Sequence, residues 1–181
     1  MAFNFSRCQG LILEGILAGI RACAGTIACA AKEEQVTGIS LDLVPWHRAL
    51  GLSIRQCTEH GDDVRYCNVE WAYFDVISNR PCPELELAAA FIHEAYTSEN
   101  SNHLAIEMAH MIFLAGAEAL LDARVAMTLS EVGIDAPICG DNFMPRPFEY
   151  MVFDFDGTFP GNYCDLVLAN RVAARWWPKL Q

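Results

Sequence analysis

The chain has 181 residues, and its 12 Lys and Arg against 23 Asp and Glu give a formal net charge of −11. This length suits one domain, and we expect residues 1–181 to form a single α+β domain. Hydrophobic residues make up 53% of the chain and charged residues 19%, which excludes an intrinsically disordered protein. Nucleic-acid binding depends on clustered Lys and Arg, so the acidic balance argues against it.

The longest apolar stretch, residues 8–31, is interrupted by Glu14 and Arg21. A bilayer span needs roughly 20 residues with few or no charges, and a signal peptide needs an apolar centre. We therefore expect neither a membrane anchor nor an export signal, and we predict a cytoplasmic protein. In that compartment the eight cysteines are expected to be free thiols.

The first element is predicted to be a helix. Arg7, Glu14 and Arg21 recur every seven residues, which places them on one solvent-exposed stripe of that helix. Glycines lower helix propensity but allow another backbone to approach closely, and we expect close packing to explain the four found here. These are Gly10, Gly15, Gly19 and Gly25.

From Val36 the apolar period changes to two, which predicts strands. The alternation covers residues 39–43 and 50–54, and the few residues between them, Pro45–Ala49, are suited to a hairpin connection. Extended segments at 64–77 and 148–155 complete the prediction. We expect an antiparallel sheet of about four strands packed against about four helices.

Three further helices are predicted from their end signals. One begins near Pro83, and a second runs from His103 to Val132 with Gly133 as its C-terminal cap. The last covers residues 165–177 and has Asn162 as its N-terminal cap.

The negative charge is concentrated in the central helices. Between Glu84 and Asp135 there are nine acids and one base, so this region carries 1 − 9 = −8 of the net charge. One interpretation is a solvated face that keeps the protein in solution, and the other is a docking surface for a basic protein. For the second interpretation the candidate partner-binding acids are Glu94, Glu118 and Asp122.

The tip of the predicted hairpin carries Trp46, His47 and Arg48 in succession. A large aromatic side chain beside two hydrogen-bonding side chains on a loop is typical of an interface hot spot. The alternative is a tryptophan folded back over the edge of the sheet. We include all three residues among the candidates for partner binding.

The run from Phe153 to Thr158 resembles the first motif of the haloacid dehalogenase superfamily of phosphotransferases. The resemblance implies that Asp154 is the nucleophile, that Asp156 is the general acid and base, and that Mg²⁺ bridges carboxylate and phosphate. It covers six residues, and the segment that follows, 159–181, holds a single lysine. The alternative is a strand that ends in a tight turn at Asp156-Gly157.

A second possible metal site lies on the long central helix. His103, Glu107 and His110 are spaced so that all three fall on one side of a helix and could face one ion. The alternative is an exposed polar face on which Glu107 pairs with the neighbouring imidazoles. No nucleotide-binding loop occurs in the chain, so we predict no cofactor.

Three functions from different classes therefore stay open. We favour a small acidic binding protein that neutralises or regulates a basic protein partner, as toxin-immunity proteins do. The alternative is a metal-dependent hydrolase or phosphatase that uses Asp154 and Asp156, or the helix histidines. The third is a structural subunit of a homo-oligomer.

Overall fold

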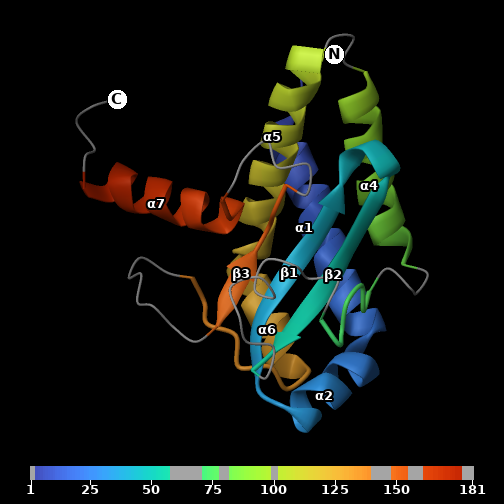
Figure 1. Ribbon diagram of the computed structural model, residues 1–181, viewed down its shortest axis with the longest axis vertical. Helices are drawn as coiled ribbons and strands as arrows, with labels where there is room; N and C mark the ends of the chain where they lie inside the picture. Colours follow the sequence, from blue (N-terminus) through green and yellow to red (C-terminus); the bar gives the residue numbers. More distant parts are fainter. Residues whose placement is uncertain are drawn as a thin grey trace.

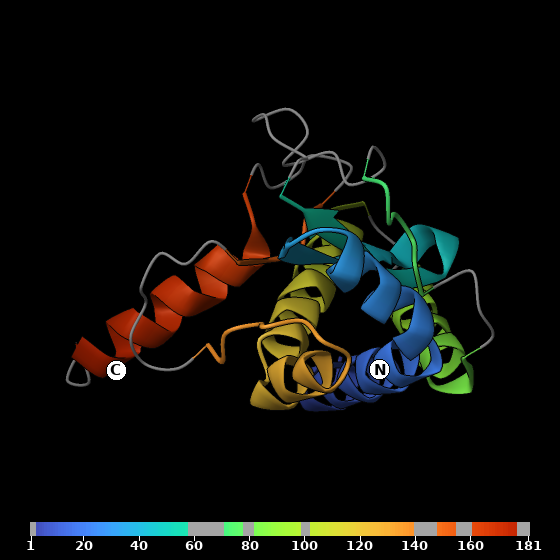
Figure 2. The same ribbon diagram turned by 90° about the horizontal axis from the view of Figure 1, so that it is seen from below.

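A computed structural model of the chain describes residues 3–57, 71–77, 82–98, 102–139, 148–154 and 161–176. This part of the chain is α+β, with six α-helices and a three-stranded mixed sheet. Figures 1 and 2 show the helices packed on one side of the sheet, while the last helix leads away from the body.

The N-terminal region forms two helices, α1 (Phe5–Ala22) and α2 (Ala24–Glu33), which meet at a bend of 71°. The Asn4 side chain caps α1 by accepting a hydrogen bond of 2.9 Å from the Arg7 amide. The charged stripe of α1 is exposed, as expected, and its isoleucines are buried. A single helix was the expectation, and the break occurs because the backbone leaves the helical conformation at Cys23.

The glycines of these two helices fall into two groups. A Cβ atom added at Gly19 would lie 2.7 Å from Ile77 Cγ2, and one added at Gly15 would lie 3.2 Å from Leu85 Cδ2. By contrast, Gly10 and Gly25 have open space around them. The predicted close packing is thus confirmed at two of the four positions, where α1 meets α4 (Pro83–Thr97).

The predicted hairpin is confirmed. Strands β1 (Val36–Val44) and β2 (Ala49–Gln56) pair antiparallel through the short 3₁₀ helix η1 (Pro45–His47). Arg48 closes the connection with a left-handed backbone, at φ 52°. The apolar face of the hairpin packs against α5 (Asn102–Leu120), where Leu41 and Leu43 lie close to Gly116.

The other face of the hairpin is polar and is also buried. Four of its residues are at most 8% exposed: Ser40, Asp42, Ser53 and Arg55. Arg55 crosses the sheet, since its Nη1 donates to Glu149 Oε2 at 3.0 Å and its Nε donates to Thr37 Oγ1 at 3.2 Å. Its guanidinium thus ties all three strands together.

The predicted sheet is wrong in two respects within the described residues. It has three strands, in the order β2-β1-β3, and β3 (Glu149–Met151) runs parallel to β1. The expected third antiparallel strand is reduced to one bridge between Ile54 and Tyr73, and its first half lies outside the described residues. Between β2 and β3 the described chain forms three helices. A connection of this length can bring the next strand back parallel to β1.

Most of the remaining helices begin close to the positions that the capping residues in the sequence predicted. The long central helix is two helices, α5 and α6 (Ala123–Glu131), because Asp122 accepts a hydrogen bond of 2.9 Å from the Arg124 amide and starts a new one. Gly133 follows α6 with a φ of 92°. Helix α7 (Tyr163–Trp176) begins after Asn162, whose Oδ1 accepts from the Cys164 amide at 3.0 Å.

One described helix is long and apolar enough to be tested as a membrane span. This helix segment is His103–Leu120, with a mean hydropathy of 1.2. Helices α1 and α2 are long enough to span a membrane only if the two are counted together as one broken span. Half of the α5 stretch is buried inside the protein, where it includes Phe113 and Ile112. Packing in the core accounts for the buried half of this stretch, while Leu104, Ile106 and Met111 are exposed.

We predict that Gly19→Ala lowers the free energy of unfolding by about 1–3 kcal/mol relative to Gly10→Ala. The new methyl group at Gly19 would press on the β-branched Ile77, whereas at Gly10 it meets nothing and alanine favours the helix by up to about 1 kcal/mol. Urea unfolding of both variants measures the difference. Equal midpoints for the two would contradict the packing assigned to Gly19.

Candidate functional site

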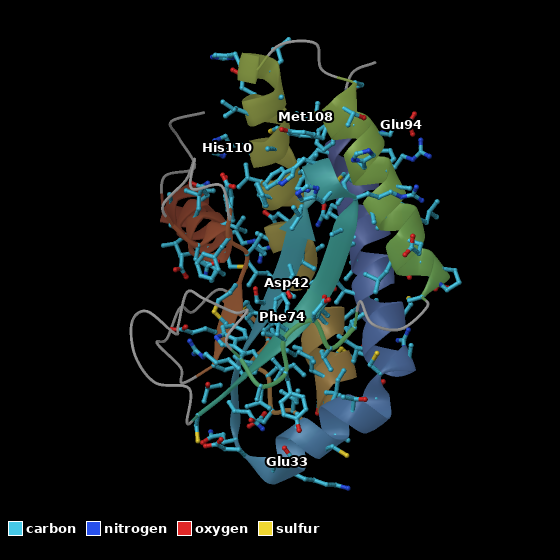
Figure 3. The ribbon with its side chains drawn as sticks, turned by 45° about the vertical axis from the view of Figure 1, so that its right-hand side comes forward. Glu33, Asp42, Phe74, Glu94, Met108 and His110 are labelled. Atoms are coloured by element: carbon cyan, nitrogen blue, oxygen red, sulfur yellow. The ribbon has the colours of Figure 1, made fainter. Side chains whose placement is uncertain are left out.

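The hairpin tip is fastened to the C-terminal half of α4. The carbonyl oxygen of Pro45 lies 2.9 Å from His93 Nδ1, and the ring of Trp46 lies 6.0 Å from that of Tyr96. Trp46 is half-buried by this contact, which agrees with the folded-back alternative, while His47 and Arg48 are exposed. The structure thus brings the predicted tip residues beside the helix that carries Glu94, which Figure 3 labels.

The other two predicted acids lie elsewhere and have partners in the chain. Glu118 of α5 accepts a hydrogen bond from Arg171 of α7. Asp122 accepts from Arg124 Nε at 3.0 Å, and this hydrogen bond is the largest of the causes that lower the pKa of the Asp122 carboxyl. The six predicted partner-binding residues therefore form two separate groups.

A pocket of about 310 Å³ lies between β2, α4 and the segment 71–77. Three carboxylates line it, those of Asp42, Asp75 and Glu86, together with the guanidinium of Arg48 and the exposed ring of Phe74. Sequence reasoning found Arg48 and missed the three acids. The one signal for the pocket in the sequence was Asp42, a charged residue between the apolar positions of the first predicted strand.

A short chain of hydrogen bonds holds the floor of this pocket. The Ser53 hydroxyl donates to Asp42 Oδ2, and Ser53 Oγ accepts from the Asp75 amide at 2.8 Å. Asp75 has a left-handed backbone at φ 55°, a conformation that aspartate adopts more readily than most residues. In Figure 3, Asp42 and Phe74 are labelled close together at the sheet.

The helix histidines have different partners. His103 Nδ1 lies 3.4 Å from Glu107 Oε1 on the exposed side of α5, whereas His110 Nδ1 is hydrogen-bonded to the Tyr163 hydroxyl. The structure therefore does not turn the three predicted ligands toward one point. Within the described ranges, no group of three or more His, Cys, Asp or Glu side chains is placed to hold a metal ion.

Tyr163 joins α7 to the core beside Asp154. Its ring stacks on Phe113 at 5.2 Å, and its burial together with the nearby Asp154 carboxylate raises the pKa of the phenol well above its usual value. Asp154 is itself buried. Asp156 lies outside the described residues, so the hypothesis of a catalytic carboxylate pair stays a prediction.

The seven cysteines within the described residues are free thiols. Burial raises the pKa of Cys8 to about 12. The pKa of Cys57 is also raised, chiefly because its thiol donates a hydrogen bond to Glu34, with 2.7 Å between Sγ and Oε1. Both thiols are therefore poor nucleophiles at neutral pH.

Comparisons with models of known protein families, with curated proteins and with solved structures found no match. The function is therefore argued from the geometry of the described residues.

We predict that Asp122→Ala destabilises the protein by about 0.5–2 kcal/mol, because it removes the cap of α6. Glu94→Ala removes the same charge from an exposed position, and the free energy of unfolding should then change by less than about 0.5 kcal/mol. Chemical denaturation of both variants makes the comparison. A stability loss at Glu94 as large as that at Asp122 would show that Glu94 has a structural role.

We also predict that stability falls as the pH rises above about 10, the pKa of an unfolded tyrosine. The raised pKa of Tyr163 means that the folded state keeps a proton that the unfolded state has lost, so its contribution is present below that pH and is lost above it. Tyr163→Phe should therefore show a shallower decline between pH 9 and pH 11.

Phe113→Leu is the control for this alkaline measurement, since it removes the ring that stacks on Tyr163 and keeps the phenol. It should lower stability across the whole pH range. If Tyr163→Phe declines as steeply as the unmodified protein, burial of the phenol does not cause the alkaline loss.

Proposed function

We propose that this protein is a small acidic, cytoplasmic binding protein that neutralises or regulates a basic protein partner, in the manner of toxin-immunity proteins. One observation carries the proposal. The acids Glu84, Glu86 and Glu94 of α4 have no basic partner in the described part of the chain. We call the surface formed by these acids, Leu87 and the hairpin tip the α4 face.

The charge on the α4 face is uncompensated by its own helix. Between Pro83 and Thr97 the sequence has no Lys or Arg. Elsewhere Arg55 is paired with Glu149 and Arg171 with Glu118, while the guanidinium of Arg7 lies 5.0 Å from the centre of the Phe91 ring on α4. A predominantly negative field raises association rates with a basic protein and orients the encounter.

The α4 face also offers apolar contact. Leu87 is 59% exposed and lies between Glu86 and Glu94 along the helix. The neighbouring pocket adds the exposed ring of Phe74. An apolar centre with charged surroundings is the arrangement found in many protein interfaces.

Catalysis draws less support from the described residues. Ser53 is fully buried, and its hydroxyl donates to the Asp42 carboxylate. Among the described residues Ser53 is hydrogen-bonded to Asp42 and Asp75, neither of which is a histidine that could act as its base. The close approaches at Gly15 and Gly19 of α1 are to residues of the same chain, so these two glycines give no support to the homo-oligomer alternative.

Native mass spectrometry of the protein purified gently from its own host tests the proposal. We expect a stoichiometric complex with one basic protein. The double change Glu86→Lys and Glu94→Lys should weaken that complex by about tenfold or more, because it reverses two charges on the docking surface.

Glu131→Lys is the matched control, since Glu131 is an equally exposed acid that lies on α6. Its complex should keep its affinity within about threefold. If Glu131→Lys weakens the complex as much as the double change does, net charge explains the loss of affinity and the α4 face does not. A spectrum that contains only copies of this chain would favour the homo-oligomer instead.

A further inference from the structure

Helix α7 presents an accessible surface beyond its first turns. Its first half enters the core through Tyr163, Cys164 and Val167, each at most 3% exposed. Residues 169–174 are exposed, and among them the apolar side chain of Val172 is 37% exposed. In Figures 1 and 2 this part of α7 extends away from the body of the protein.

Four residues of α7 follow the spacing of a helix-pairing seam. Asp165, Leu168, Val172 and Arg175 are separated by three, four and three residues, which is the heptad spacing of paired helices. On an ideal helix these positions fall within roughly 80° of one another. Asp165 and Val172 are exposed, and Leu168 is half-buried. We call these four residues the α7 seam.

The α7 seam is complementary to itself. Its two apolar positions and its two charged positions are each centred on Asn170. If two copies of α7 pair antiparallel about a two-fold axis, Leu168 of one copy therefore faces Val172 of the other. Asp165 of each copy then faces Arg175 of the other, so opposite charges meet at both ends.

The charges also specify the direction of pairing. A parallel pair would place Asp165 opposite Asp165 and Arg175 opposite Arg175, and like charges at close range repel. The protein as a whole carries −11, whereas α7 contains one acid and two arginines. Contact through α7 thus brings two copies of an acidic protein together without placing acid against acid.

We propose that two copies of this chain associate by antiparallel pairing of their α7 seams. Such a contact is isologous, because the same surface of each copy meets its counterpart across a two-fold axis. Helix α7 has 14 residues and is about 21 Å long, so the interface is smaller than that of a permanent dimer. The dimer is therefore expected to depend on protein concentration.

This arrangement goes beyond the proposed function and is compatible with it. Antiparallel pairing puts the two protein bodies at opposite ends of the helix pair, because each body is attached to the first turns of its own α7. Figures 1 and 2 show α4 on the side of the body away from α7. A dimer would therefore present two α4 faces.

Sedimentation velocity of the full chain tests the inference. We expect the average mass to rise towards that of a dimer as the concentration goes from micromolar to millimolar. Val172→Asp should raise the dissociation constant by about tenfold or more, because it places an unpaired carboxylate against Leu168 of the other copy. A protein that stays monomeric throughout this range overturns the proposal.

Asn170→Asp is the matched control, since it adds the same charge to an exposed position on the side of α7 away from the seam. Its dissociation constant should stay within about threefold of that of the unmodified protein. If both variants weaken the dimer equally, added charge explains the effect and the α7 seam does not form the contact.

An exchange of charges tests the direction of pairing. Asp165→Arg or Arg175→Asp alone places like charges at both ends of the contact, and each should weaken the dimer by about tenfold. The double change Asp165→Arg and Arg175→Asp exchanges the two charges and should restore affinity to within about threefold. Loss of helix stability at either position would not be repaired in this way, so a double variant weaker than both single ones contradicts antiparallel pairing.

The outcome for the dimer is independent of the outcome for the basic partner. A complex with a basic host protein that contains a single copy of this chain, from a protein that is monomeric by itself, overturns the α7 pairing alone. A dimer that depends on Val172, without any basic partner from the host, supports the α7 pairing and overturns the proposed function.

Discussion

The structure depends on a sheet face that is both polar and buried. A buried polar side chain is costly unless it is hydrogen-bonded, so this face determines what can lie around it. Ser53 links Asp42 to the backbone of Asp75 and thereby places the segment 71–77 over the hairpin. Arg55 reaches Glu149 and so holds β3 beside β1. The same bonds that stabilise the hairpin also build one wall of the pocket.

The two edges of the sheet are met by different parts of the chain, a side chain at β3 and the segment 71–77 at β2. Asn162 closes the β3 edge and also starts α7, so one amide side chain serves two purposes. The β2 edge is met by Tyr73 at Ile54, and Leu50 and Leu52 beyond it are buried. Beside β2 stand the acids of α4, and Arg48 of the hairpin tip lines the same pocket as Glu86.

Local signals in the sequence predicted much of the fold. The hairpin, the start of α4 at Pro83 and the Asn162 cap depend on neighbouring residues and were readable. The parallel direction of β3 depends on where three helices return the chain, which no local pattern records. Asp122 was interpreted as surface charge, although it is a helix cap. The pocket was missed because Asp42 has the position of a solvent-facing residue in a two-residue alternation.

Helix α7 has a buried first part and an exposed second part. Its first turns are buried, with Tyr163 and Cys164 in the core, whereas residues 169–174 are exposed on every side as the helix leaves the body in Figure 1. Isolated helices shorter than about 12–15 residues are marginal in water because the first turn is costly to form. The outer half therefore extends from a nucleus that Asn162 and the core supply, and Arg171 adds a hydrogen bond to Glu118 of α5. The helix content of residues 169–174 therefore depends on whether the sheet edge at β3 is formed.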